Sequence, residues 1–81
     1  MPFYFFHWTE EIVEHLAEND VSLEEFEEVV QDEFSESTTS RSTGRPARIG
    51  LTEDGRTLFC VFNWLDREQT QIEPVTAYEI D

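Results

Sequence analysis

A run of aromatic residues opens the chain, with PFYFFHW at positions 2–8. Aromatic side chains are enriched in β-strands, and successive side chains of a strand point to opposite faces. The run therefore predicts a first strand with two different faces. One face carries Phe3, Phe5 and His7, and the other carries Tyr4, Phe6 and Trp8.

Helical spacing follows directly after this strand. Thr9 is a favourable N-cap, and Glu10 and Glu11 fall in the first turn, where the positive end of the helix dipole favours acids. The apolar residues of the next two turns share one side. We therefore expect a helix from Thr9 to about Glu18 with one face toward the core.

A second helix has the clearest local signal in the sequence, in the segment VSLEEFEE. Ser22 is placed as its N-cap, and Glu25 is placed to complete a capping box. Apolar residues recur at helical spacing from Leu23 to Val30, and glutamates occupy the opposite side. We interpret these glutamates as a solvated helix face rather than as a metal or peptide site.

The middle of the chain predicts a loop followed by a hairpin. Residues 33–44 are rich in serine and threonine without periodicity, which indicates a loop. The apolar runs ARIGL and TLFCVFNWL then flank Asp54-Gly55, the preferred central pair of a type I′ turn. Pairing across that turn places Leu51 opposite Leu58.

This register assigns the side chains of the hairpin to two faces. Toward the helices it places Ala47, Ile49, Leu51, Leu58, Cys60, Phe62 and Trp64. On the outer face it places Arg48 and Gly50 together with Phe59 and Val61. A slip of one residue, with a three-residue loop, would exchange these faces.

The last segment, TQIEPVTAYEI, should return as a final strand after the polar turn Asp66–Gln69. Pro74 has no N–H to donate, so it indicates an edge position or a bulge. The predicted order is β-α-α-β-β-β in a single domain over residues 1–81. We expect an α+β fold in which two N-terminal helices pack on one face of a small, mainly antiparallel sheet.

Composition is consistent with one folded domain of 81 residues, 38% of them apolar. No apolar run approaches the roughly 20 residues of a membrane span, and the first residues lack the features of a signal peptide. We therefore expect a cytoplasmic protein that does not enter a membrane. Cys60 lies inside LFCVF, where a thiol is expected to act as a small hydrophobic side chain and not as a nucleophile.

Charge changes this picture. The chain has nineteen acids against five arginines and no lysine, a formal net charge of −14. Such a charge repels nucleic acid at long range and favours solubility or a basic partner. A surface adapted to a salty cytoplasm is an alternative that needs no partner, and mimicry of nucleic acid by the acids is another.

Four of the five arginines fall within SRSTGRPARIGLTEDGR, residues 40–56. One interpretation is a phosphate-binding site formed by Arg41, Arg45, Arg48 and Arg56, because a guanidinium pairs with two phosphate oxygens. The other is a set of weak surface ion pairs. In that case Arg56 would pair with Glu53 across the turn, and Arg41 and Arg45 would meet carboxylates of the helices.

Five segments follow one another in a recognisable order over nearly the whole chain. They are an aromatic strand ending in Trp8, then NDVSLEEFEEVVQD, SRSTGRPARIGLTEDGR, TLFCVF and IEPVTAYEI. In this order and spacing the chain resembles the BrnT-like toxins and related domains of unknown function in the RelE-like superfamily. The resemblance implies a small, metal-independent endoribonuclease of a type II toxin-antitoxin pair, inhibited by a cognate antitoxin.

For such a ribonuclease, the resemblance implies arginines that hold the phosphate and separate groups that transfer protons. Arg45 and Arg48 would be the catalytic cations, supported by the phosphate contacts of Arg41 and Arg56 already described. Glu73, Tyr78 and His7 would be the proton-transfer candidates, and no metal or cofactor is expected. His7 and His15 are also interpretable as packing residues, since their spacing fits neither a triad nor a metal site.

A protein partner is expected on either interpretation of the chemistry. Phe59 and Leu65 suggest an apolar patch for a cognate antitoxin or for a second copy of the chain, while RNA remains a possible substrate. Where BrnT-like toxins usually carry basic residues, this chain has AEND and AYEI. That difference favours the alternative of a non-catalytic protein-binding module on the same scaffold.

Overall fold

This computed structural model describes residues 4–80, which contain two helices and five strands. Phe3, expected in the first strand, lies outside these residues. In chain order the elements are β1 (Phe5–Phe6), α1 (Glu10–Glu18), α2 (Leu23–Gln31), β2 (Glu36–Thr39), β3 (Pro46–Leu51), β4 (Thr57–Trp64) and β5 (Gln71–Glu79).

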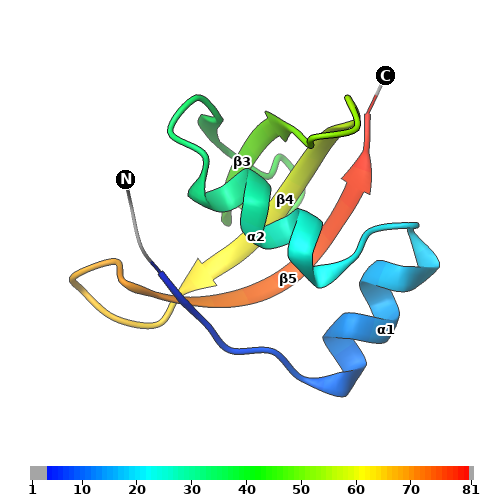
Figure 1. The fold of residues 1–81 in the computed structure, drawn as a ribbon. Coiled ribbons are helices and arrows are strands. Elements are labelled where there is room, and N and C mark those ends of the chain that lie inside the picture. The colour runs from blue at the N-terminus through cyan, green and yellow to red at the C-terminus, as the bar shows by residue number, and fades with distance from the viewer. Residues whose placement is uncertain (1–3, 81) are drawn as a thin grey trace.

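The strands form one mixed sheet in the order β1-β5-β4-β3-β2. β2, β3, β4 and β5 pair antiparallel with their neighbours, and β1 pairs with β5 in parallel. Helix α2 crosses one face of this sheet, which we call the inner face (Figure 1). The expected α+β class is therefore confirmed, but the sheet is larger than expected and contains a parallel pair.

Strand β2 was expected to be part of a loop, and that expectation was wrong. Its four residues, ESTT, are all exposed and pair with β3 from Glu36 opposite Ile49 to Thr39 opposite Pro46. A strand with polar residues on both faces has no alternation of apolar and polar positions. The sequence therefore carries no periodic signal for it.

Both helices begin where the sequence places their caps. The Ile12 N–H donates to the Oγ1 of Thr9 at 3.2 Å. At α2, the Glu25 N–H donates to the Oγ of Ser22 at 3.1 Å, and the Ser22 N–H donates to a Glu25 carboxylate oxygen at 3.0 Å. The predicted capping box is therefore confirmed. The sequence alone could predict it, because its bonds join residues only three positions apart.

The core lies between α2 and the inner face of the sheet. Phe26, Val29 and Val30 of α2 are buried there with Leu58 and Cys60 of β4. Burial raises the pKa of the Cys60 thiol to about 12. The expected role of this thiol as a core side chain is confirmed, since its nucleophilic thiolate form is disfavoured.

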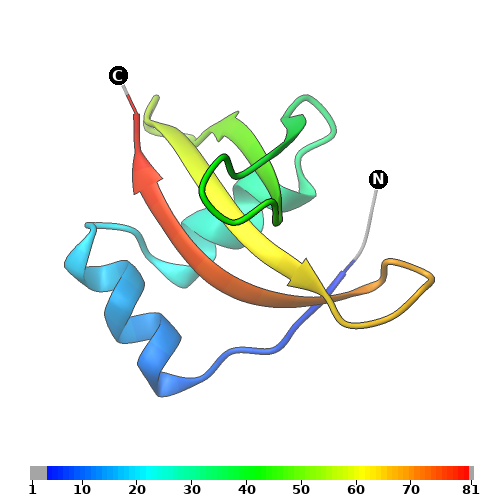
Figure 2. The ribbon, with the colours of Figure 1, turned by 180° about the vertical axis from the view of Figure 1, so that it is seen from behind.

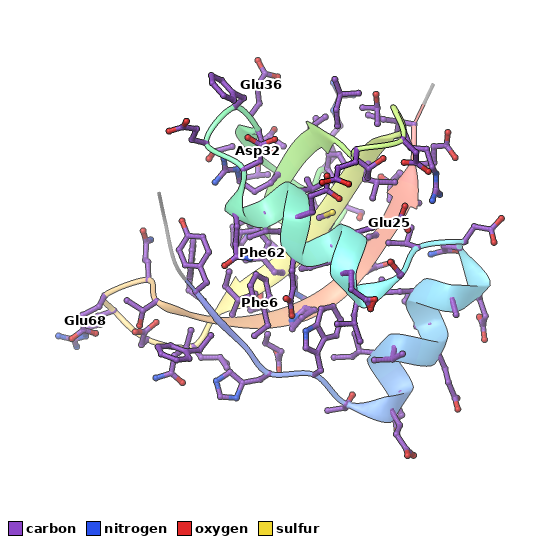
Figure 3. The ribbon with its side chains drawn as sticks, in the orientation of Figure 1. Phe6, Glu25, Asp32, Glu36, Phe62 and Glu68 are labelled. Carbon is purple, nitrogen blue, oxygen red and sulfur yellow. The ribbon has the colours of Figure 1, made fainter. Side chains whose placement is uncertain are left out.

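Alternation in the first strand is also confirmed for the described residues. Tyr4, Phe6 and Trp8 pack against the core, whereas Phe5 and His7 are exposed. The Phe6 ring meets the Phe26 ring edge to face, with 6.2 Å between centroids. Figure 3 shows Phe6 and Phe62 beside α2, on the inner side of the sheet.

The expected register of the β3–β4 hairpin was wrong by one residue. Arg48 lies opposite Cys60 and Gly50 opposite Leu58, so Arg48 and Gly50 share the inner face with these core residues. The faces of β4 are as predicted, with Phe59 outside. On β3 the faces are exchanged. Ala47, Ile49 and Leu51 lie on the outer face, which points away from α2.

The loop of the hairpin explains this shift. The Thr52 N–H donates to the Arg56 carbonyl at 2.9 Å, which leaves three residues between the closing pair instead of two. Gly55 has a φ of 85°, in the left-handed region that such a loop requires at its last position. Asp54-Gly55 therefore forms part of a three-residue loop and not a type I′ turn.

An irregularity in the β4–β5 ladder lies next to Pro74. Phe62 pairs with Pro74 and Val61 with Thr76, which leaves Val75 without a partner in the ladder. The bulge that a missing N–H predicts in this strand is therefore confirmed. β5 is an interior strand at its start, where it lies between β1 and β4.

Candidate functional site

The sequence suggested that Arg48 faces solvent on the outer surface, and this expectation was wrong. Arg48 lies on the inner face. Its Nη2 donates to the carbonyls of Asp32 and Ser35 at 3.0 and 2.7 Å. These carbonyls follow the last turn of α2, whose final C=O groups have no partner within the helix. Arg48 therefore acts as a C-terminal cap that ties α2 to β3, and this use competes with phosphate binding.

Arg56 is also held by internal contacts. Its Nη1 lies 2.9 Å from a carboxylate oxygen of Glu25, and its Nε donates to Glu79 at 3.2 Å. The expected ion pair with Glu53 was wrong, because the three-residue loop pairs Arg56 with Thr52 and not with Glu53. Arg56 instead connects the first turn of α2 with the end of β5.

Arg41 and Arg45 lie in the β2–β3 loop, on the other side of the sheet from α2. Figure 2 views the sheet from that side, with the green loop in front of β4. Among residues 4–80, neither guanidinium forms an ion pair, so the expected pairing with the acids of the helices was wrong. The sheet separates this loop from α2.

The β2–β3 loop borders a groove of about 410 Å³ on the outer face, which we call the outer groove. It is lined by Thr38, Thr39, Ser40, Arg41, Ser42, Ile49, Phe59 and Tyr78. Phe59 and Tyr78 are cross-strand partners whose rings stack, with centroids 5.4 Å apart and an interplanar angle of 24°. The structure thus brings Arg41, Phe59 and Tyr78 together, although they are distant in the sequence.

The other proton-transfer candidates lie outside the outer groove. His7 forms a side-chain hydrogen bond with Gln71 at 2.8 Å. Glu73 accepts a hydrogen bond from Asn63 at 3.1 Å. Tyr78 is therefore the one proposed proton-transfer residue that lines this groove. The lining also contains Arg41, but no carboxylate or imidazole.

Four apolar side chains form a continuous strip on the outer face, which we call the apolar strip: Ile49, Leu51, Phe59 and Tyr78. Leu51 is 59% exposed and Tyr78 43% exposed. Ile49 and Leu51 were missed as surface residues, because the wrong register placed them in the core. The alternative register with a three-residue loop, which the sequence also allowed, would have placed both residues on the outer face.

Leu65 belongs to a different part of the surface. It follows β4, six positions after Phe59, and a strand rise of about 3.3 Å per residue separates the two by about 20 Å. Phe34, between α2 and β2, is 87% exposed and was not predicted as a surface contact. It lies in a segment without periodicity, so the sequence gave no signal for it.

Comparison with protein-family models, with curated proteins and with solved structures finds no match for this chain. Within residues 4–80, no helix has the length and apolar character needed to cross a membrane. The same residues contain no group of three or more histidine, cysteine or acidic side chains placed to hold a metal ion.

Proposed function

We propose that this chain is a protein-binding module on a BrnT-like scaffold and that its apolar strip contacts a basic protein partner. The observation that carries the proposal is the exposure of this strip on the sheet face that points away from α2, where Leu51 is 59% and Tyr78 43% exposed. A contiguous apolar patch on a small protein is typical of a protein interface.

Charge at the edge of the strip supports a basic partner. Glu36, Ile49, Phe59 and Tyr78 form one cross-strand row over four strands, so an acid stands at one end of three apolar residues. Protein interfaces commonly combine an apolar centre with a charged rim. With a formal charge of −14 on the chain, a positively charged partner is attracted and a second copy is repelled.

The BrnT-like assignment is part of the proposal and rests on the order of the segments in the sequence. On that scaffold the partner would be a cognate antitoxin. The use of Arg48 and Arg56 in internal contacts supports a binding role rather than RNA cleavage, since two of the four clustered arginines are already engaged.

A metal-independent endoribonuclease is the second candidate, and the outer groove is the observation in its favour. A stacked aromatic pair can hold a nucleobase, and a neighbouring guanidinium can hold a phosphate. Arg41, Phe59 and Tyr78 supply these groups. The excess of acids and the positions of His7 and Glu73 outside the groove weigh against this candidate.

Binding is tested by titrating the purified chain with the protein encoded beside it, using calorimetry. Tyr78→Ser should weaken the complex at least about tenfold, because truncating a buried aromatic anchor of an interface costs about 2 kcal/mol or more and about 1.4 kcal/mol corresponds to tenfold. Leu65→Ser is the matched control, since Leu65 is similarly exposed but lies outside the strip, and it should bind normally.

Cleavage is tested with mixed-sequence RNA in EDTA at low and high salt. The proposal predicts intact RNA with the wild-type protein. Cleavage that is lost in Arg41→Ala, with the fold retained, would replace the binding module by the ribonuclease. Equal weakening of the protein complex by Tyr78→Ser and Leu65→Ser would remove the apolar strip as the interface.

A further inference from the structure

Strand β2 is the open edge of the sheet. It ends the strand order, and residues 4–80 provide no strand beyond it. The opposite side is protected, because β1 pairs with the start of β5 and α1 lies against the rest. Hydrogen bonds join His15 to Thr76 at 2.9 Å and Asn19 to the Ala77 carbonyl at 3.0 Å.

The ladder determines which backbone groups of β2 face outward. The Ser40 N–H donates to the Arg45 carbonyl at 2.8 Å. Since bonding and non-bonding pairs alternate in an antiparallel ladder, Thr38 and Glu36 bond toward β3. The N–H and C=O groups of Ser37 and Thr39 then point away from the sheet. The position of Pro46 opposite Thr39 agrees with this alternation, because a non-bonding pair does not need the N–H that proline lacks.

Apart from its short length and the charge of Glu36, this edge lacks the usual protection against pairing. Natural edge strands are commonly blocked by lysine, proline, a bulge or a covering segment. β2 has the sequence ESTT, all four residues are exposed, and its pairing with β3 runs without a bulge. The exposed ring of Phe34 lies just before the strand and offers an apolar contact beside it.

Charge selects the kind of segment that fits this edge. Asp32, Glu33 and Glu36 surround the start of β2, and none forms an ion pair within residues 4–80. Asp32 and Glu36 lie at the same corner of the molecule (Figure 3). A second copy would bring the same acids together on two chains of charge −14, whereas a basic segment would compensate them.

We infer that β2 accepts an extended, basic segment of a protein partner as an additional strand of the sheet. The inference rests on the proposed protein-binding function and names the part of the partner that is bound. The main chain of the segment pairs with Ser37 and Thr39. Its side chain beside Glu36 is basic and extends the cross-strand row that ends in Tyr78, and its side chain beside Thr38 extends the row that ends in Thr76.

The probe is a fluorescent eight-residue peptide of alternating lysine and valine. Its matched control has the same sequence and charge but carries N-methyl groups on alternate residues, in both possible phases, so that it cannot pair through those N–H groups. The protein variant is Ser37→Pro combined with Thr39→Pro, which removes the outward donors and leaves the bonds of Thr38 to β3. Proline is tolerated at edge positions whose N–H faces solvent.

The parent peptide should bind, and N-methylation or the double proline variant should weaken binding by about tenfold or more, because backbone hydrogen bonds are lost. In the complex, the amide protons of Ser37 and Thr39 should gain protection from hydrogen exchange. Thermal unfolding of the double proline variant checks that the fold is retained, and the N-methylated peptides test the pairing on the unaltered protein.

Equal binding of the N-methylated and parent peptides, without new protection at Ser37 and Thr39, would overturn strand addition. The proposed function would survive that result if Tyr78→Ser still weakened the complex with the neighbour-encoded protein. Dimerisation of the free protein through β2 would replace the basic segment by a second copy. Protection of the same amides by RNA and not by the peptide would assign the edge to nucleic acid.

Discussion

Gly50 and Ser35 approach so closely that a Cβ atom on Gly50 would lie 2.0 Å from the Ser35 Oγ. The same atom would lie 3.2 Å from a methyl carbon of Val29 in α2. The end of α2 can therefore rest on β3 only where β3 has no side chain. This contact places the α2–β2 connection, and with it the open edge strand, against the sheet.

Gly50→Ala should destabilise the protein by about 1–3 kcal/mol, because the added methyl group overpacks a closely fitted site. Chemical denaturation followed by circular dichroism measures this change. Ser35→Ala is the companion variant, since the Ser35 Oγ is buried without a hydrogen-bond partner among the described residues. The double variant should cost less than the sum of the two single changes. Strict additivity would contradict the contact.

Arg48→Met should lower the free energy of unfolding by about 2 kcal/mol, because the carbonyls of Asp32 and Ser35 lose a charged donor while the aliphatic part is retained. Urea denaturation measures the loss. Arg41→Ala is the matched control on an exposed arginine and should change stability by less than about 0.5 kcal/mol. If Arg48→Met were as stable as the wild type, Arg48 would not be a helix cap and its phosphate-binding role would need to be reconsidered.

Cys60 should make the protein sensitive to alkaline pH. Burial raises the pKa of its thiol in the folded protein from 9.0 to about 12. The contribution of the buried, neutral thiol to stability is therefore complete below the unfolded pKa and is lost as pH rises toward 12. Iodoacetamide at pH 8.5 should leave the native thiol unmodified and modify it in urea, as detected by mass spectrometry. Rapid modification of the native protein would contradict the burial.

Cys60→Ala provides the internal comparison for this pH dependence. The variant should be less stable at neutral pH because it leaves a small cavity. Its stability should nevertheless decline less than that of the wild type between pH 9 and 12. Parallel decline of the two proteins would assign the alkaline loss to other groups.

The arginine cluster illustrates what a sequence cannot establish about a site. Four arginines lie within residues 40–56, but strand alternation and two loops direct them to different surfaces. Arg48 points toward α2, Arg56 reaches Glu25 and Glu79, and Arg41 borders the outer groove. Proximity along the chain therefore did not predict a common site, whereas Arg41 and Tyr78 line one groove from distant segments.

By itself, the sequence determined the features that depend on neighbouring residues. The capping box joins Ser22 and Glu25 across three positions, and the faces of β4 follow from strict alternation. These features need no knowledge of the rest of the fold. They were sufficient to predict both helices, the core role of Cys60 and the α+β class.

Only the tertiary structure decided the faces of β3 and the existence of β2. A difference of one residue in the hairpin loop reverses every side chain of a strand, and the sequence allowed both loops. The choice agrees with contacts that are distant in the chain, since Gly50 fits beneath the end of α2 and Arg48 caps it. β2 is held by pairing with β3 and has no apolar pattern of its own, so its open edge could be found only in the folded chain.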